Sequence, residues 1–142
     1  MNVGVYSFKR VELREATECV RQIINPGLVD NIFIYSENTN KERMSQREAF
    51  KKVLDDYEKR KIELIVFKDL DSIGQSTYVR ALIFRELINR KCKYCSVKEN
   101  IHNFNIGGRL FTTALIKQAL DEKKYGDERS KIGQEIKRKL KE

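Results

Sequence analysis

The chain alternates short apolar runs with segments whose apolar residues recur every three or four positions. The runs are rich in β-branched and aromatic residues and predict strands, whereas the recurring spacing is that of amphipathic helices. Strands are expected at 2–6, 31–35, 62–67 and 93–97, and helices at 11–24, 47–59, 78–89 and from 109 onwards. This alternation is typical of βαβ units, so we expect a three-layer α/β fold, in which a mainly parallel sheet of roughly four to five strands has helices on both faces.

The last predicted helix is longer than one small sheet needs to cover it. It begins at Arg109 after a loop at 99–108, and we expect Gly126 to interrupt it. A long terminal helix of this sort often forms a dimer contact. We therefore divide the chain into an α/β domain over 1–106 and a long basic helix over 107–142, and we expect no separate DNA-recognition domain.

Positive charge is concentrated at the end of the chain. The formal net charge is +8, and the last twenty residues hold eight Lys and Arg against four acids, which is half of that total. An excess of this kind favours a polyanionic partner such as nucleic acid. The alternative is a solvated helix end whose charge serves only solubility.

Several classes of protein are excluded by composition. No apolar run approaches the ~18 residues of a membrane span, and the first residues lack the pattern of a signal peptide. Three cysteines, an odd number, suit a reducing compartment better than a disulfide framework, so we expect a cytoplasmic location.

Other chemical signals along the chain are weak. Cys92 and Cys95 form a C-x-x-C pair, but a zinc site needs more ligands and only Cys19 and His102 remain. We expect His102 to be a surface residue of the loop at 99–108. We expect neither a metal nor a cofactor.

A series of short motifs, in a particular order and spacing, gives the strongest functional signal. The motifs are SQREAF at 45–50, LDSIGQS at 70–76, SVKENI at 96–101, GRLFTT at 108–113 and ERSKIG at 128–133. Together they resemble the catalytic domain of the serine recombinases, the resolvase/invertase family, over residues 2 to 133. The resemblance implies the resolvase-like fold, a homodimer formed through the long helix, and an arm that lies along the DNA minor groove.

The family breaks DNA by attack of a serine hydroxyl on a backbone phosphate. Clustered arginines stabilise the negative charge of the transition state through bidentate hydrogen bonds. By this resemblance, Arg10 stands at the position of the nucleophilic serine and Phe8 at that of an arginine. Ser72 and Gln75 replace two further arginines.

Other positions of the family site are retained. These are Arg47, Asp71 and Glu122, although Lys123 follows Glu122 where the family has an arginine. Removing one electrostatic donor from an active site typically costs about 3 kcal/mol, or roughly 100-fold in rate. With the nucleophile and three arginines lost together, we expect the cleavage reaction to be abolished.

Two alternatives exist for the altered positions. Ser72 or Ser76, on the loop where arginines are expected, could approach a phosphate and replace the nucleophile. Ser7, at an odd offset along a strand, should face away from the side of Arg10. Arg10 itself either holds DNA without cutting it or pairs with Asp71, and we expect the ion pair.

We therefore expect a catalytically degenerate serine-recombinase-like protein that associates with DNA, weakly or without sequence specificity, and acts in site-specific recombination or regulates it. Its partners would be DNA, a second copy of the chain and an active recombinase subunit. Two alternatives remain open: an active, divergent recombinase with a relocated nucleophile, and a structural homodimerisation module that does not bind DNA. The expected DNA contacts are Arg10, Arg47, Arg109, Lys123, Lys124, Arg129, Lys131 and Arg138.

Overall fold

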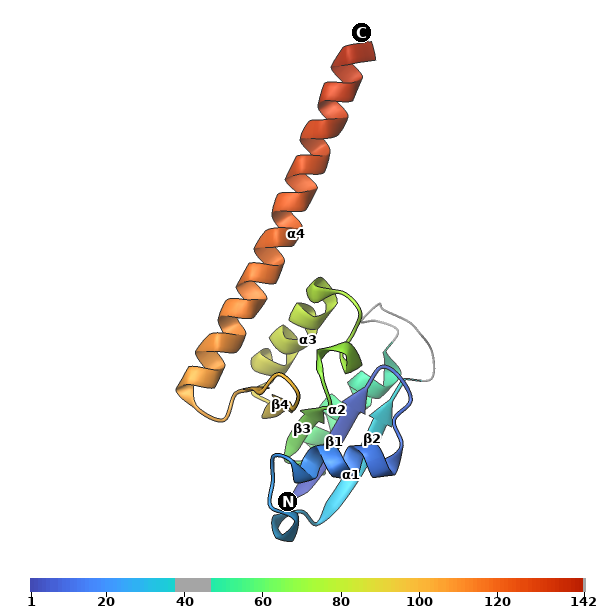
Figure 1. Ribbon diagram of the computed structural model, residues 1–142, viewed down its shortest axis with the longest axis vertical. Coiled ribbons are helices and arrows are strands. Elements are labelled where there is room, and N and C mark those ends of the chain that lie inside the picture. Colours follow the sequence, from blue (N-terminus) through green and yellow to red (C-terminus); the bar gives the residue numbers. More distant parts are fainter. Residues whose placement is uncertain (38–46, 142) are drawn as a thin grey trace.

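The computed structural model describes the backbone of residues 1–37 and 47–141, and the side chains of 1–37 and 47–123. The described residues form one five-stranded sheet with the order β2-β1-β3-β4-β5. Its strands are β1 (Asn2–Ser7), β2 (Asn31–Ser36), β3 (Leu64–Phe67), β4 (Tyr94–Ser96) and β5 (Ile101–His102). The first four are parallel to one another, and β5 pairs antiparallel with β4. The expected mainly parallel α/β sheet is confirmed (Figure 1).

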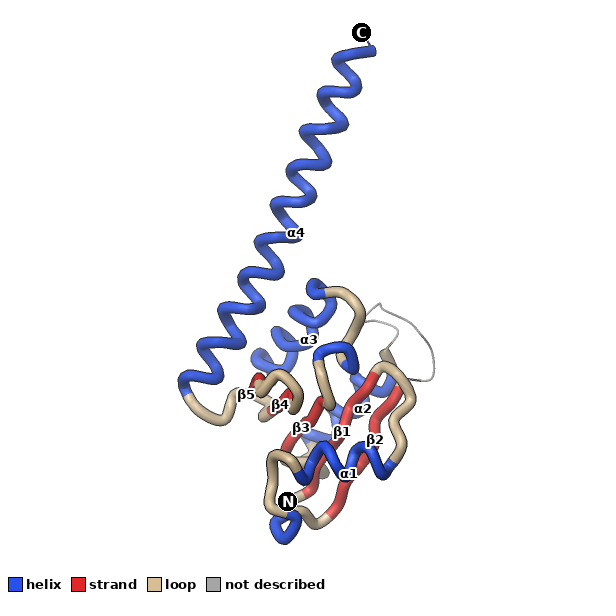
Figure 2. The backbone as a smooth tube through the Cα atoms, viewed as in Figure 1, coloured by secondary structure: helices blue, strands red, loops and turns tan. Residues whose placement is uncertain are grey.

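Helices cover both faces of this sheet (Figure 2). They are α1 (Leu13–Arg21), α2 (Glu48–Glu58), α3 (Thr77–Asn89) and α4 (Ile106–Lys141), with short 3-10 turns at η1 (Pro26–Leu28) and η3 (Leu70–Ser72). Ala16 and Val20 of α1 pack with Val3 and Val5 on one face. On the other face, α2 and α3 bury their apolar sides in the larger core cluster. Both faces are covered, which explains why the strands read as continuous apolar runs.

The segment expected to be a loop at 99–108 contains a strand and a helix start. Asn103 completes the edge of β4: its Oδ1 accepts a hydrogen bond from the Tyr94 backbone N–H at 3.0 Å, and its Nδ2 donates to the Cys92 carbonyl at 2.7 Å. These side-chain bonds extend a strand pairing that is only two residues long in β5. His102 therefore lies in the sheet and is partly buried, which corrects its expected place in a surface loop.

Helix α4 begins three residues before the expected Arg109 and runs without a break past Gly126. The expected interruption is wrong, because one glycine costs about 1 kcal/mol relative to alanine and the neighbouring residues favour helix. At its start α4 lies against β5, where a Cβ added to Gly108 would be 2.4 Å from the His102 carbonyl oxygen. Ile116 and Ala119 then join the core beside α3, and the remainder projects beyond the sheet (Figure 1).

Candidate functional site

Three segments meet at the carboxyl end of the central strands. They are the residues after β1, the turn that contains η3, and the start of α2. The Phe8 backbone N–H donates to the Ser72 carbonyl at 2.8 Å, and the Arg47 guanidinium donates to the Ile73 carbonyl. Ligand sites of open α/β sheets lie at this edge. The structure therefore brings together most of the residues expected from the family motifs.

Arg47, the arginine retained from the family motif, is completely buried, with 0% of its surface exposed. Its Nη1 lies 3.4 Å from the Tyr6 hydroxyl, and the Phe8 ring packs against the guanidinium with 5.3 Å between its centroid and Cζ. An arginine in a protein keeps its charge, so this burial requires compensation from neighbouring groups. Arg47 therefore has no surface accessible to solvent in this structure.

Glu37 is joined to this group through the Tyr6 hydroxyl. It accepts hydrogen bonds from the Tyr6 hydroxyl at 2.9 Å and from the backbone N–H groups of Ala49 at 2.6 Å and Phe50 at 3.3 Å. The carboxylate thus caps the first turn of α2, where the helix dipole favours negative charge. Burial raises the pKa of the Tyr6 phenol, so its protonated hydroxyl donates to Glu37 while its oxygen accepts from Arg47.

Sequence analysis missed Glu37. The available signal was its position as an acid directly after the second strand, at the carboxyl edge of a parallel sheet.

Asp71 pairs with Arg80, not with Arg10. The Arg80 Nη2 lies 2.7 Å from the Asp71 Oδ1, and its Nε donates to the Gly74 carbonyl at 2.7 Å. The expected ion pair between Arg10 and Asp71 is absent from the described residues, and Arg10 is exposed. The first turn of α3 places Arg80 over the turn that carries Asp71, whereas Arg10 follows β1 in an extended segment. Arg80 is a second residue of the site that the motifs did not reveal.

The serines near the site have structural contacts. Ser72 donates its hydroxyl to Asp69 at 2.8 Å, and Ser76 caps α3 by accepting from the Val79 N–H at 3.0 Å. Ser7 is buried, and its Oγ accepts from the Lys9 N–H at 3.1 Å. Strand β1 ends at Ser7, so the alternation of side chains along a strand does not extend to Arg10. It therefore does not determine how Ser7 is oriented relative to Arg10.

The expected residues on α4 lie apart from this buried group. Arg109 and Lys123 are exposed, and the Lys123 Nζ lies 5.8 Å from the centroid of the Tyr78 ring on α3. Glu122 is exposed and lines, with Arg80, a largely apolar groove of 290 Å³ between α3 and α4. Gln75, which lies between η3 and α3, is also exposed. The side chains of Lys124, Arg129, Lys131 and Arg138 lie outside the described residues.

The C-x-x-C pair does not have the properties of a redox or metal site. Cys92 and Cys95 are buried, and burial raises the pKa of each thiol to about 11, which keeps them protonated at neutral pH. His102 accepts a hydrogen bond from the Phe104 N–H at its Nδ1 and stacks on the Phe104 ring. Across the side chains described, no three His, Cys, Asp or Glu residues gather as metal ligands.

None of the helices, within the described part of the chain, combines the length and apolarity needed to cross a bilayer.

Comparison with solved structures identifies the fold. The chain is similar to the N-terminal catalytic domain of TP901-1 integrase, with a TM-score of 0.65 and 17% identity, over 89% of this chain and 98% of the other. It is also similar to a resolvase family site-specific recombinase from Streptococcus pneumoniae, with a TM-score of 0.63 and 13% identity, over 100% of this chain and 99% of the other. At these identities the similarity establishes the resolvase-type fold.

Sequence comparison establishes the family. No curated protein is significantly similar to the chain. A family model described as "Resolvase, N terminal domain" matches residues 9–142, which is nearly the whole sequence. The expected resemblance is confirmed: this chain belongs to the resolvase N-terminal domain family, whose members include the catalytic domains of serine recombinases.

Proposed function

We propose that this chain acts in site-specific recombination without cleaving DNA, by binding DNA and by dimerising through α4. The observation that carries the proposal is the complete burial of Arg47 beneath Phe8. Transfer of a phosphodiester requires a nucleophile and preorganised cations around one phosphate. At this edge of the sheet, the retained guanidinium instead contacts a ring, a phenol and a carbonyl oxygen.

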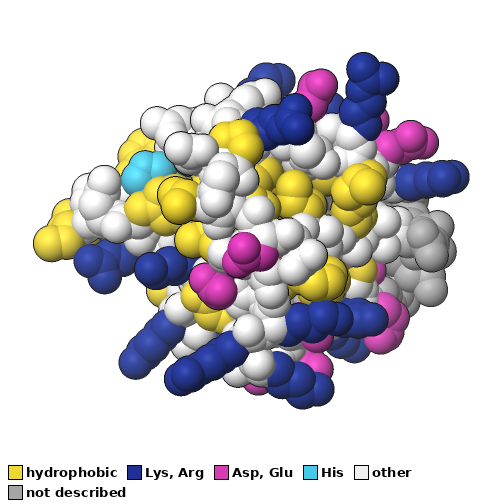
Figure 3. All heavy atoms as spheres, turned by 90° about the horizontal axis from the view of Figure 1, so that it is seen from below, with side chains coloured by type: hydrophobic (Ala, Val, Ile, Leu, Met, Phe, Trp, Pro, Cys, Tyr) yellow, Lys and Arg dark blue, Asp and Glu magenta, His cyan; other side chains and the backbone are white. Residues whose placement is uncertain are grey.

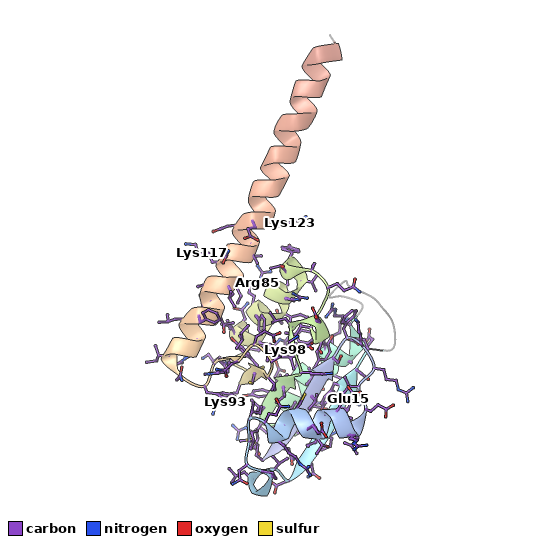
Figure 4. All side chains as sticks on the ribbon, viewed as in Figure 1. Glu15, Arg85, Lys93, Lys98, Lys117 and Lys123 are labelled. Atoms are coloured by element: carbon purple, nitrogen blue, oxygen red, sulfur yellow. The ribbon has the colours of Figure 1, made fainter. Side chains whose placement is uncertain are left out.

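The proposed DNA contacts are exposed cations. Arg10, Arg109 and Lys123 remain from the sequence-based set, and Lys124, Arg129, Lys131 and Arg138 extend it along the segment 107–142, the proposed arm. Two further cations that the motifs did not indicate are exposed, Arg85 on α3 and Lys117 on α4, and both are labelled in Figure 4. We leave Arg47 out of the proposed contacts because it is buried.

Basic side chains are not confined to α4. The end of the molecule seen from below carries Lys and Arg around its rim as well (Figure 3). The contribution of α4 to DNA binding is therefore measured with single-residue variants, because net charge does not distinguish α4 from the basic rim at the other end of the molecule.

An uncovered apolar surface supports dimerisation. Ile106, Leu110 and Phe111, in the first turns of α4, are 67%, 66% and 55% exposed. They lie on the side of the helix opposite Thr112 and Ile116, which are buried. Apolar side chains gathered in this way mark a protein interface. The proposed occupant is α4 of a second copy, and an active recombinase subunit of the same fold would present an equivalent helix.

The three cysteines are free and buried, which fits the proposed cytoplasmic location.

The test is a salt series of binding to duplex DNA of mixed sequence. Phosphate contact predicts that log K falls linearly with log salt, by about 0.9 for each phosphate neutralised. Oligomeric state is measured in parallel by sedimentation. A dimer that shows no salt-dependent binding would contradict the DNA-binding proposal and support the structural homodimerisation module.

A further inference from the structure

Strand β2 is the open edge of the sheet. It stands first in the order β2-β1-β3-β4-β5, and within the described residues β1 is the strand that pairs with it. An edge strand presents a row of backbone N–H and C=O groups on its outer side, and these groups can pair with a strand of another chain. The opposite edge, β5, has two residues and lies beside α4. The open edge is therefore separate from the proposed dimer surface on α4 (Figure 2).

The side chains of β2 leave this edge unprotected. The strand has six residues, with neither a charged residue nor a proline among them. Ile32, Phe33 and Ile34 are half-buried, whereas all four residues of β3 are buried. Soluble proteins commonly protect a long edge with charge, proline or a bulge, because an unprotected edge pairs with other chains. These features favour a partner strand beside β2.

A groove lies beside β2 on each face of the sheet. Ile32 and Ile34 pack toward the cluster that contains α1, and Phe33 packs toward the cluster that contains α2. The groove on the α1 face has a volume of 300 Å³ and the groove on the α2 face has a volume of 360 Å³. Successive side chains of a strand point to opposite faces, so a strand added at this edge places alternate side chains in the two grooves.

The groove on the α2 face carries positive charge. Lys52 and Lys61 line it, both are exposed, and Lys52 takes part in no salt bridge among the described residues. The acid that lines this groove, Asp56, is buried and accepts a hydrogen bond from the Tyr35 hydroxyl at 2.6 Å. The Lys61 ammonium also lies 3.8 Å from Asp56. Because Asp56 already has these two partners, the Lys52 ammonium remains for an acidic side chain of another chain.

The groove on the α1 face is suited to apolar side chains. Leu13, Ile24 and Val29 line it, and Leu13 is 61% exposed. Arg21 and Asp30 are charged residues of its lining, and the N-terminal ammonium holds Asp30 at 2.5 Å. An aliphatic side chain in this groove removes apolar surface from water, which stabilises a complex. Arg21 adds positive charge at the same edge of the sheet.

We propose that β2 binds an extended segment of another protein, about six residues long, in which apolar and acidic side chains alternate. The backbone of the segment pairs with the outer side of β2. Its aliphatic side chains enter the groove on the α1 face, and its Asp or Glu side chains meet Lys52 and Lys61. Backbone hydrogen bonds supply the affinity of such a complex, and the alternate grooves supply its specificity. A second copy of this chain fits less well, because β2 itself carries no acid.

Fluorescence anisotropy tests the proposal with a labelled peptide of about eight residues that alternates valine and glutamate. We expect the unaltered chain to bind this peptide with a Kd below about 1 mM, and at least about tenfold more tightly than a peptide that alternates valine and lysine. Hydrogen exchange should slow at 31–36 on binding and stay unchanged at 64–67. No binding up to about 1 mM, or equal binding of the lysine peptide, would overturn the proposal.

Charge reversal at Lys52 locates the bound peptide. Lys52→Glu should weaken binding of the glutamate peptide about tenfold at low salt and less at high salt, because a like charge then faces the peptide. Lys93→Glu makes the same change at an exposed lysine before β4, outside both grooves, and should leave the Kd unchanged. Both lysines are exposed, so both variants should fold. Equal weakening by the two variants would show that the peptide responds only to net charge, and the site beside β2 is then refuted.

Two further measurements separate strand addition from other modes of binding. The glutamate peptide with N-methyl groups on its central residues lacks the backbone N–H donors, and it should bind at least about tenfold more weakly. Equal binding of the methylated peptide would refute strand pairing. Sedimentation with and without the peptide tests for a second copy at the edge: a dimer that the peptide dissociates would overturn the choice of partner. These results involve neither DNA nor α4, so they are independent of the function proposed above.

Discussion

Two regions of this molecule hold cations that were expected to contact DNA, and the regions differ in how far they bury those cations. At the carboxyl edge of the sheet, Arg47 is buried and contacts Tyr6, Ile73 and Phe8. On α4, Arg109 and Lys123 are exposed to solvent. Burial decides what these cations can contact. Arg47 forms its bonds inside the fold, whereas Arg109 and Lys123 face solvent.

The positions where an arginine is expected but absent are of two kinds. By the family resemblance, Ser72, Gln75 and Phe8 each stand where an arginine is expected, and Phe8 in addition packs its ring against the Arg47 guanidinium. Arg47 is therefore inaccessible to solvent as well. Arg47 belongs to a hydrogen-bond network that joins β1, the end of β2 and the start of α2.

The largest expected effect follows from breaking that network. Arg47→Met removes the donor that serves the buried Tyr6 hydroxyl and the Ile73 carbonyl, and each buried polar group left unsatisfied typically costs about 1 to 3 kcal/mol of unfolding free energy. Denaturant unfolding measures the loss. An unchanged unfolding free energy in Arg47→Met would show that these groups do not depend on Arg47.

The next effect concerns the apolar surface of α4. Leu110→Glu places a charge in the proposed interface, and loss of a central interface residue costs about 2 kcal/mol or more, roughly 30-fold in the dimer Kd. Sedimentation equilibrium reports the change. Leu28→Glu makes the same substitution at an equally exposed leucine on η1 and should leave the dimer intact. Equal weakening by both variants would place the interface elsewhere.

A smaller effect is expected for the exposed cations. Arg109→Gln and Lys123→Gln should each lower the salt slope of DNA binding by about 1 and weaken binding similarly for all sequences. Lys52→Gln, at an exposed lysine on α2, is the control for net charge. If the control changes the slope as much as the α4 variants, the DNA does not preferentially contact α4.

The smallest effect is expected at Asp71. Its ion pair with Arg80 is short, but the Asp71 side chain is 76% exposed. Exposed pairs contribute about 0 to 1 kcal/mol, so Asp71→Asn should change the unfolding free energy far less than Arg47→Met. The same denaturant assay compares the two. A loss for Asp71→Asn as large as for Arg47→Met would remove the distinction between exposed and buried charges drawn above.

The sequence predicted the sheet and its covering helices because buried strands and amphipathic helices leave a strong periodic pattern. It did not predict β5, whose two residues carry no periodic signal and whose pairing with β4 is extended by the side chain of Asn103. The predicted interruption of the last helix at Gly126 was wrong, because one glycine destabilises a long helix only slightly.

The site was predictable only in part. The motifs located Phe8, Arg47 and Asp71, but they did not show which way each side chain faces. The partners depend on contacts between residues far apart in the chain: Tyr6 and Glu37 are 31 positions apart, and Asp71 and Arg80 are nine. A single sequence gives the residue types at such positions, whereas their burial is set by the packing of several elements.

The most direct test of the account is a search for a covalent protein–DNA adduct. The chain is incubated with supercoiled DNA at concentrations at which the salt series shows saturation, quenched with denaturant, and analysed by gel and mass spectrometry. We expect bound DNA to be released intact, with no nicking and no phosphoserine linkage. A denaturant-resistant adduct that maps to Ser7, Ser72 or Ser76 would contradict the account and establish an active recombinase with a relocated nucleophile.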